Sequence, residues 1–143
     1  MQDFKIYLSG AMSGISWEEQ TKWRRQFQNA IKFGDYDYEK KVTFFDPTQY
    51  YNFEEKRHKN EKEIMEFDLY NLRNSNLVVV NLGNNGYKSI GTSMELILAK
   101  ELRIPVIAFN RNEETHPWIL EVCSRICDSL KETVEYTVEF YLN

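Results

Sequence analysis

The stretch LVVVNLGNNGYKSIGTSMELILAK, residues 77–100, decides the fold. It opens with an uninterrupted apolar run, which is typical of a strand buried on both faces of a sheet. A loop containing Gly83, Gly86 and Gly91 follows, and the chain then enters a helical pattern. The apolar residues of that helix recur at helical spacing: Met94, Ile97, Leu98 and Leu102. The stretch therefore predicts a central strand, a glycine-rich loop and a helix packed on the sheet.

Glu95 interrupts the apolar face of this helix. It shares one line of the helix with Gly91, Leu98 and Leu102, in the first turn after the loop. That position lies just beyond the carboxyl end of the predicted central strand, where open α/β sheets bind their ligands. Glu95 is therefore our first candidate for a functional residue.

Composition and charge exclude several classes of protein. The chain has 143 residues, 18 basic and 22 acidic, with a net charge of −4 and no basic cluster. We expect one domain (residues 1–143) with a real core, and no nucleic-acid partner, which would require clustered Lys and Arg. No apolar run approaches the roughly 20 residues of a membrane span. Residues 1–8 read as a strand rather than a signal peptide, so we expect a cytoplasmic protein without a membrane partner.

The first strand leads into a candidate anion-binding loop. Residues 5–8 (KIYL) form the strand, and the first loop (residues 9–16, SGAMSGIS) contains Gly10 and Gly14. Ser16 begins a capping box, S-W-E-E, so a helix starts there. Free backbone N–H groups and the helix dipole at such a terminus favour phosphate. The alternative is a tight strand–helix turn that binds no ligand.

The second strand, residues 42–45 (VTFF), ends at Asp46 and is followed by an irregular aromatic segment. Such a segment beyond the carboxyl end of a strand often forms a lid or a pocket wall. Its aromatic residues Tyr50, Tyr51 and Phe53 can stack on a planar ligand or, equally, cover a sheet edge.

Asp68 is a second carboxylate in an apolar setting. It lies in the middle of the apolar face of a predicted helix, residues 61–74, four residues from both Ile64 and Leu72. Buried carboxylates are uncommon unless they are paired or hydrogen-bonded. Asp68 either caps a neighbouring loop or serves as an acid whose pKa is raised by its apolar surroundings.

The last third of the chain completes the predicted fold. Residues 104–109 form another buried strand, and a helix that carries Cys123 and Cys127 as reduced core thiols follows. Strict alternation over residues 133–143 predicts a final half-buried strand. Five strands alternating with helices indicate an α/β fold, a doubly wound five-stranded parallel sheet of the flavodoxin or Rossmann kind.

The fold brings Asp68 and Glu95 towards one pocket beside the first loop. Paired carboxylates suit glycosidic chemistry, in which one is the nucleophile or base and the other the acid. The helix N-terminus should keep Glu95 ionised, and the apolar wall should keep Asp68 protonated. The residues alone thus predict a small α/β protein that cleaves an acetal-like bond in an anionic ligand.

Three segments in order resemble the nucleoside 2-deoxyribosyltransferase family, which includes the deoxynucleoside 5′-monophosphate N-glycosidases. They are KIYLSGAMSG (residues 5–14), EIMEFDLYNLRNSNLVVVNL (residues 63–82) and SIGTSMELILAKELRIPVI (residues 89–107). The resemblance covers roughly residues 4–110. It implies an enzyme that transfers or hydrolyses an N-glycosidic bond.

The resemblance also implies catalytic roles. In that family a Glu in an S-x-G-x-x-x-E-L context attacks C1′ of the sugar, which implies Glu95 and a covalent glycosyl-Glu intermediate. An Asp in the helix before the central strand assists the leaving base, which implies Asp68. A Tyr in the first strand holds the nucleophilic carboxylate, which implies Tyr7.

Substrate-binding residues and partners follow in the same way. Members that act on monophosphates bind the 5′-phosphate at positions matching Gly10, Ser13, Gly14, Ser89 and Gly91. We also expect Met12 and Asp46 to bind substrate. The resemblance implies a small-molecule nucleoside or nucleotide substrate and neither a metal nor a cofactor. Family sites are completed by a neighbouring subunit, which implies a homo-oligomer (a dimer or higher).

Two other functions remain open from the sequence. An NAD-cleaving domain of the Toll/interleukin-receptor type also uses a helix Glu, although Asp68 counts against it. A non-catalytic nucleotide-binding or sensor module would use Glu95 and Asp68 only to hold ribose hydroxyls. The sequence does not distinguish hydrolysis from transfer, because both pass through the same covalent intermediate.

Overall fold

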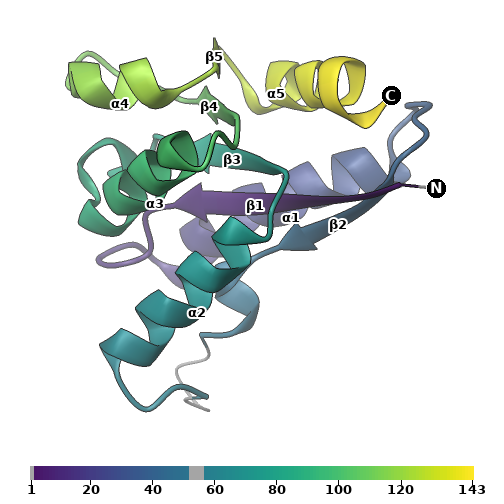
Figure 1. Cartoon of the computed structure of the whole chain (residues 1–143). Helices are drawn as coiled ribbons and strands as arrows, with labels where there is room; N and C mark the ends of the chain where they lie inside the picture. The colour runs from purple at the N-terminus through teal and green to yellow at the C-terminus, as the bar shows by residue number, and fades with distance from the viewer. Residues whose placement is uncertain (1, 52–56) are drawn as a thin grey trace.

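The computed structural model describes residues 2–51 and 57–143 of the chain. Within them one parallel sheet runs in the order β2-β1-β3-β4-β5 (Figure 1). Its strands are β1 (Asp3–Gly10), β2 (Lys41–Phe45), β3 (Leu77–Asn81), β4 (Val106–Phe109) and β5 (Arg125–Cys127). This is the flavodoxin-like strand order, so the predicted fold class is confirmed.

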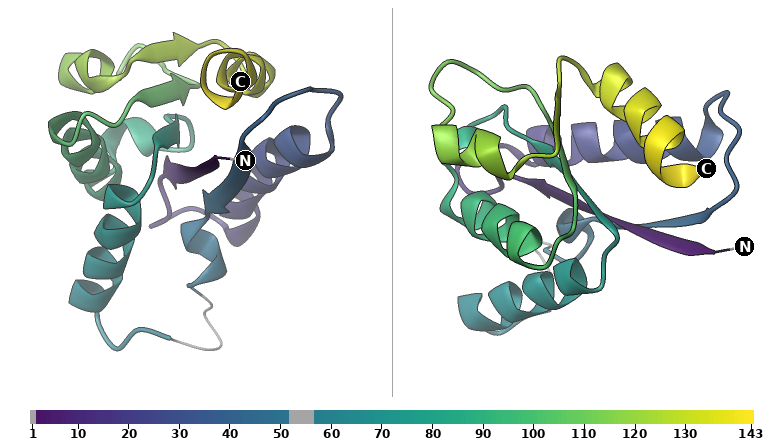
Figure 2. Two further views of the ribbon diagram at one scale, coloured as in Figure 1. Left: turned by 45° about the vertical axis from the view of Figure 1, so that its right-hand side comes forward. Right: turned by 45° about the horizontal axis from the view of Figure 1, so that its top comes forward.

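Helices cover both faces of the sheet (Figure 2). One face carries α1 (Trp17–Phe33) and α5 (Leu130–Thr137), whose apolar side chains share a core with one side of the strands. The other face carries α2 (Glu61–Arg73), α3 (Ile90–Glu101) and α4 (Pro117–Val122). Because both faces are covered, the central strands read as continuous apolar runs rather than alternating ones.

The central strand β3 is buried along its whole length, as its apolar run predicts. It pairs in parallel with β1 from Ile6–Leu77 to Gly10–Asn81. The carboxyl ends of β1 and β3 therefore lie side by side, and α3 begins a few residues beyond β3. This is the switch point of the strand order, where such sheets bind ligands.

The strand predicted over residues 133–143 is wrong. This segment forms α5 and a short π-helix, Val138–Leu142, that continues it. Every fourth residue of the alternating pattern also falls on one helical face, and Val134, Val138 and Leu142 are the side chains that reach the core. Ser129 caps α5 by accepting a hydrogen bond from the Glu132 N–H, which favours a helix over a strand.

The helix predicted to carry both cysteines is also wrong. The helix α4 ends at Val122, Cys123 follows it, and Cys127 lies in β5, the fifth strand of the sheet. Both thiols are free, as predicted. The apolar residues between 119 and 127 serve a short helix and a short strand in succession, so their apparent helical period has no single structural origin.

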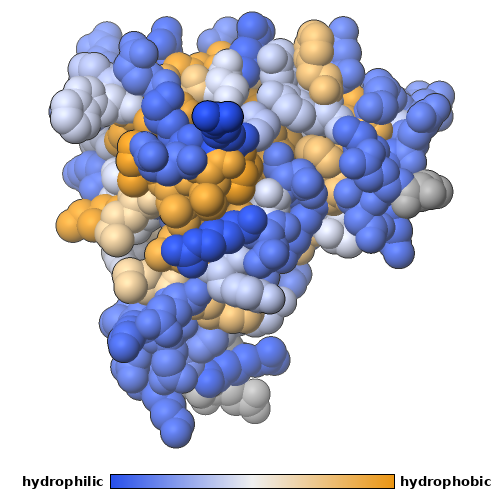
Figure 3. Space-filling model, in the orientation of Figure 1, coloured by the Kyte–Doolittle hydropathy of each residue, from blue (hydrophilic) through white to orange (hydrophobic). Residues whose placement is uncertain are grey.

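The outer face of α3 differs from the predicted buried stripe. Leu96 and Ala99 pack on the sheet, whereas Met94 and Ile97 are 46% and 49% exposed. Figure 3 shows a hydrophobic area over the side of the molecule where α3 lies. The apolar residues of this helix thus serve two surfaces, of which one is solvent-exposed in the single chain.

No helix within residues 2–51 and 57–143 is long and apolar enough to cross a membrane.

Candidate active site

A cleft of about 490 Å³ opens at the carboxyl edge of the sheet, and its size suits a small ligand. The first loop, the N-terminal turns of α1 and α3, and one side of α2 line it. Eight of the predicted site residues lie on its wall: Gly10, Met12, Ser13, Gly14, Asp68, Ser89, Gly91 and Glu95. Three segments far apart in the sequence therefore meet in one cleft.

Glu95 is held from the strand β1. The hydroxyl of Tyr7 donates to its Oε2, and the hydroxyl of Ser9 donates to its Oε1 at 3.2 Å. Tyr7 and Ser9 are two residues apart in β1, so their side chains lie on the same face of the sheet, towards α3. Burial and the nearby Glu95 carboxylate raise the pKa of Tyr7, so the phenol remains a donor. Both carboxylate oxygens are thus oriented before any ligand arrives.

The electrostatic state of Glu95 differs from the sequence-based expectation. The pKa of Glu95 is raised to about 7, chiefly by burial and also by the nearby Asp68 carboxylate. The hydrogen bonds from Tyr7 and Ser9 and the charge of Arg24 act in the opposite direction. Its position at a helix N-terminus therefore does not keep Glu95 fully ionised at neutral pH.

Asp68 projects from α2 into the same cleft. Its Oδ1 accepts a hydrogen bond from the Tyr51 hydroxyl. Burial raises the pKa of Asp68 to about 6, and the Tyr51 hydrogen bond and the charge of His58 oppose that rise. The pKa of Asp68 is therefore raised towards neutral pH, as its apolar surroundings predict, and Tyr51 fixes its orientation.

The two carboxyl groups titrate as a pair. The Asp68 carboxylate disfavours the ionised form of Glu95, and burial raises the pKa of Asp68 to about 6 and that of Glu95 to about 7, so their titrations overlap. Where the pair holds a single proton, these values place it mainly on Glu95, and the form with Glu95 ionised and Asp68 protonated is the minor one. A site of this kind can present a nucleophilic carboxylate and a carboxylic acid to one ligand.

Burial of Glu95 should make stability depend on pH. Its pKa rises from the ordinary 4.5 to about 7 on folding, so the folded state binds the proton more tightly. The resulting stability is present below pH 4.5 and is lost as the pH rises through 7. We expect Glu95→Gln to stabilise the protein by about 3 kcal/mol at pH 8.5 and by little at pH 4, measured by urea unfolding.

An exposed carboxylate on the same helix provides the control for this measurement. Glu101→Gln, at the end of α3, should change the free energy of unfolding equally at both pH values. If Glu95→Gln also showed no difference between pH 4 and pH 8.5, the carboxyl group of Glu95 would not be a buried charge.

The first loop owes its shape to α1. The buried Gln20 amide donates to the carbonyl oxygens of Met12 and Ile15, both at 2.8 Å. Gly14 has a φ of 75°, a left-handed conformation that side chains rarely adopt. The capping of α1 by Ser16 is observed, with its Oγ accepting from the Glu19 N–H. The loop therefore lies as an ordered rim around the N-terminal turn of α1.

Ser89 caps the second helix at the cleft. Its Oγ accepts a hydrogen bond from the Thr92 N–H, and Gly91 follows in the exposed first turn. The N-termini of α1 and α3 thus border one cleft, as the sequence predicts. Its described walls contain the carboxylate of Glu61 and neither a Lys nor an Arg.

Asp46 lies behind the cleft rather than on its wall. It is 4% exposed, and both of its oxygens have partners. Its Oδ1 accepts from the backbone N–H and the hydroxyl of Thr48, and its Oδ2 accepts from Gln28. In the described structure its carboxylate therefore has structural partners, and its substrate-binding role stays a prediction.

Ser9 and Tyr51 are site residues whose present contacts the sequence did not predict. The period of two along a strand could have revealed Ser9, because it follows Tyr7 on the same face. Tyr51 was expected to stack on a ligand or cover an edge, and it instead donates to Asp68. Tyr50 stacks on Phe45 at the edge of the sheet. Phe53 lies outside the described residues.

No group of three or more His, Cys, Asp or Glu residues in the described part of the chain is arranged to hold a metal ion.

Comparisons with known proteins show which solved structures have a similar fold. No protein-family model and no curated protein matches the sequence. Among solved structures, a 2-deoxyribosyltransferase from Bacillus psychrosaccharolyticus superposes with a TM-score of 0.70 at 21% identity, covering 92% of this chain and 91% of that one. The 2-deoxyribosyltransferase of Leishmania mexicana gives 0.69 at 15% identity, over 97% and 99% of the two chains.

A third similar structure is an N-glycosidase by name. The CMP N-glycosidase of Clostridium botulinum superposes with a TM-score of 0.58 at 13% identity, covering 95% of this chain and 99% of that one. At such identities the superpositions establish the architecture. The chain thus has the fold of the 2-deoxyribosyltransferases, the family that its three sequence segments resemble.

Proposed function

We propose that the protein cleaves or transfers the N-glycosidic bond of a (deoxy)nucleoside or its 5′-monophosphate. One observation carries the proposal. Glu95, with both oxygens hydrogen-bonded from β1, and the acid Asp68 line the same cleft in a fold shared with enzymes of this kind. Two carboxyl groups flanking one bond are the usual requirement for cleaving a glycosidic linkage.

The proposed reaction has two steps. The ionised Glu95 attacks C1′ of the sugar, the bond from C1′ to the base breaks, and its electron pair leaves on the base nitrogen. Asp68 donates a proton to the departing base, which gives neutral base and a glycosyl ester on Glu95. Water or the nitrogen of a second base then attacks C1′, the bond from C1′ to Glu95 breaks, and the ionised Asp68 accepts the proton that the attacking group loses. The choice between these acceptors separates hydrolysis from transfer.

Neighbouring side chains support this chemistry. The Tyr7 and Ser9 hydroxyls restrict Glu95 to one orientation, which lowers the entropic cost of reaching C1′. The α2 side of the cleft adds an apolar wall of Ile64, Met65 and Leu69 beside Asp68. A planar base that packs on this wall would place its nitrogen near the acid.

A substrate panel tests the proposal directly. The protein is incubated with nucleosides, deoxynucleosides, their 5′-monophosphates and NAD, with and without a second free base, and products are separated by chromatography. Free base or exchanged base supports the proposal. Nicotinamide release from NAD alone would indicate an NAD-cleaving domain, and binding by calorimetry without turnover would indicate a sensor module.

We further propose that a 5′-monophosphate is preferred to the bare nucleoside. The N-termini of α1 and α3 border the cleft, and each favours an anion by about 0.3–1 kcal/mol. Together they correspond to a preference of roughly tenfold in kcat/KM. Replacing Ser89 by Ala should raise KM for the monophosphate several-fold and leave KM for the nucleoside nearly unchanged.

The control must separate phosphate binding from helix capping. Ser129 caps α5 on the opposite face of the sheet in the way that Ser89 caps α3. Ser129→Ala should lower the melting temperature comparably without changing either KM. Equal kcat/KM for the two wild-type substrates would contradict the phosphate proposal.

We also propose that a second copy of the chain covers the exposed face of α3. Ile90, Met94 and Ile97 are exposed there, and Trp118 on the adjacent α4 is 79% exposed. A contiguous apolar face of this kind is typical of an interface. The same helix carries Ser89, Gly91 and Glu95, so the second copy would lie beside the cleft.

The oligomeric state is expected to depend on this face. By light scattering after gel filtration, the wild-type protein should have at least twice the mass of one chain, and Ile97→Glu should shift it towards a single chain. Phe33→Glu, at a more exposed apolar residue at the end of α1, should leave the mass unchanged. A wild-type protein with the mass of one chain would contradict this proposal.

A further inference from the structure

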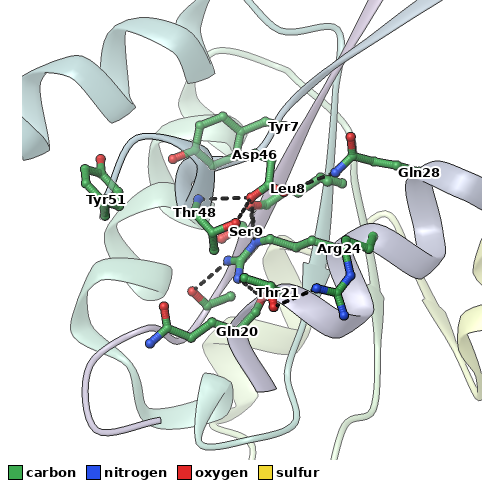
Figure 4. Close-up of polar contacts among 12 residues, drawn as sticks. Tyr7, Leu8, Ser9, Gln20, Thr21, Arg24, Gln28, Asp46, Thr48 and Tyr51 are labelled. Atoms are coloured by element: carbon green, nitrogen blue, oxygen red, sulfur yellow. Dashed lines mark hydrogen bonds and ion pairs between the residues drawn. The ribbon is translucent and has the colours of Figure 1, made fainter. Parts of the chain in front are cut away.

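A completely buried arginine lies beneath the cleft. Arg24 of α1 is 0% exposed, and its guanidinium donates to the carbonyl oxygens of Leu8, Gly10 and Gln20 (Figure 4). Its Nε lies 3.8 Å from Oδ1 of the buried Asp46. A buried cation is costly unless it is paired and hydrogen-bonded, and Arg24 meets both conditions.

The carbonyl oxygens that Arg24 binds belong to the functional edge of β1. Leu8 and Gly10 flank Ser9, which donates to Glu95. A Cβ at Gly10 would lie 3.1 Å from the Trp23 ring and 3.4 Å from the guanidinium, so a larger residue there would require these side chains to shift. One helical turn earlier, Gln20 holds the rest of the first loop. Arg24 thus binds the carboxyl end of β1 to α1 by hydrogen bonds, and Gln20 does the same for the first loop.

We infer that Arg24 is a positioning residue for the proposed reaction: its buried guanidinium fixes the carboxyl end of β1 under Glu95 and supplies the buried positive charge that faces the carboxyl pair. This inference rests on the proposed function for its role in turnover. The placement of the charge is a separate claim that can be tested without any substrate.

The charge of Arg24 opposes the effect of burial on the pKa of Glu95. Burial and Asp68 raise the pKa of Glu95, whereas Arg24 lowers it together with Tyr7 and Ser9. Tyr51 and Glu61 also line the cleft, and His58 acts on Asp68. Among these groups, the described structure places only Arg24 as a permanently charged cation buried in the protein. Its charge therefore favours the ionised, nucleophilic form of Glu95 at neutral pH.

The first experiment measures the titration of Glu95 itself. In protein labelled with ¹³C at the side-chain carboxyl groups, the Glu95 signal is assigned by its loss in Glu95→Gln and followed with pH by NMR. Arg24→Met, which removes the charge and keeps much of the volume, should raise the apparent pKa of Glu95 by about one unit or more. An unchanged midpoint in a folded Arg24→Met protein overturns the inference.

Two further variants separate the charge from folding. Asp46→Asn disturbs the same buried pair but keeps the cation, so the pKa of Glu95 should stay the same or fall. Arg24→Met combined with Asp46→Asn leaves no unpaired buried carboxylate and should show the same rise as Arg24→Met alone. If only the single Arg24→Met variant shows the rise, the effect comes from the orphaned Asp46 and the inference is wrong.

The second experiment uses turnover. Because Glu95 must be ionised to attack, the acid limb of the kcat/KM profile should move to higher pH in Arg24→Met by the same amount as the NMR midpoint, and activity should recover as the pH rises. Arg24→Lys keeps the charge but loses the fork that binds the carbonyl oxygens, so it should keep the limb in place and raise KM. A loss that is equal at every pH in both variants would assign Arg24 a merely structural role. Absence of turnover in the wild-type protein would count against the proposed function alone, since the NMR titration needs no substrate.

Discussion

Replacing Glu95 by Ala is expected to abolish base release while the fold survives. The variant loses the covalent route, which divides one difficult step into two easier ones, so kcat should fall by about 10³-fold or more. The free energy of unfolding should not fall correspondingly, because Glu95 is a buried carboxylate whose ionised form destabilises the folded state at neutral pH. Release of free base under saturating substrate is the measurement.

A carboxylate on the same helix serves as the control. Glu101→Ala removes an exposed carboxylate at the far end of α3 and should leave kcat unchanged within about twofold. Trapping of a glycosyl–protein adduct by mass spectrometry after rapid quenching should succeed for the wild type and fail for Glu95→Ala. Activity of Glu95→Ala within about tenfold of wild type would remove Glu95 from the nucleophilic role.

The second large effect is expected for Asp68→Asn. The amide keeps the shape and still accepts the Tyr51 hydrogen bond, but it cannot deliver a proton to the departing base. General acids of this kind typically contribute 10²–10⁴-fold, so kcat should fall by about 10²-fold or more. Glu66→Gln, an exposed neighbour on α2, should have no comparable effect.

The dependence on leaving group identifies what Asp68 does. A nucleoside with an N7-methylated purine carries a base that leaves without protonation, so the loss in Asp68→Asn should shrink for this substrate. The descending limb of the pH profile, near the upper titration of the carboxyl pair, should disappear in the variant. An equal loss for every leaving group would make Asp68 a residue that positions the substrate.

Much of the architecture follows from local sequence. The apolar run of β3, the loop after it and the helix around Glu95 were all expected, because a strand buried on both faces has a pattern that few other elements share. The start of α1 at Ser16 was also expected, since the capping box is a local signal with its own hydrogen bond. These features need no knowledge of distant residues.

The last segment, residues 133–143, was misassigned because its pattern suits two structures. Alternation over residues 133–143 predicts a strand, yet its core residues Val134, Val138 and Leu142 also satisfy a helix. The strand β5 occupies one edge of the sheet, and the last segment packs as a helix beside α1 on one face of the sheet. Whether residues 133–143 form a strand or a helix depends on which part of the sheet is left uncovered by the rest of the chain, and a local window of sequence does not contain that information.

The sequence by itself determined which residue types meet at the carboxyl edge of the sheet, because parallel strands bring their ends together whatever their length. It identified Glu95 and Asp68 as carboxylates on apolar helix faces near that edge, and the family resemblance added Tyr7. Only the tertiary structure decided how they are held. Ser9 donates to the oxygen of Glu95 that Tyr7 does not contact, Tyr51 donates to Asp68, and Arg24 is buried behind β1. The ionisation state of the two carboxyl groups depends on burial, on hydrogen bonds from Tyr7, Ser9 and Tyr51, and on the charges of Arg24, His58 and Asp68. These groups come together only in the folded protein, so the ionisation state exists only there.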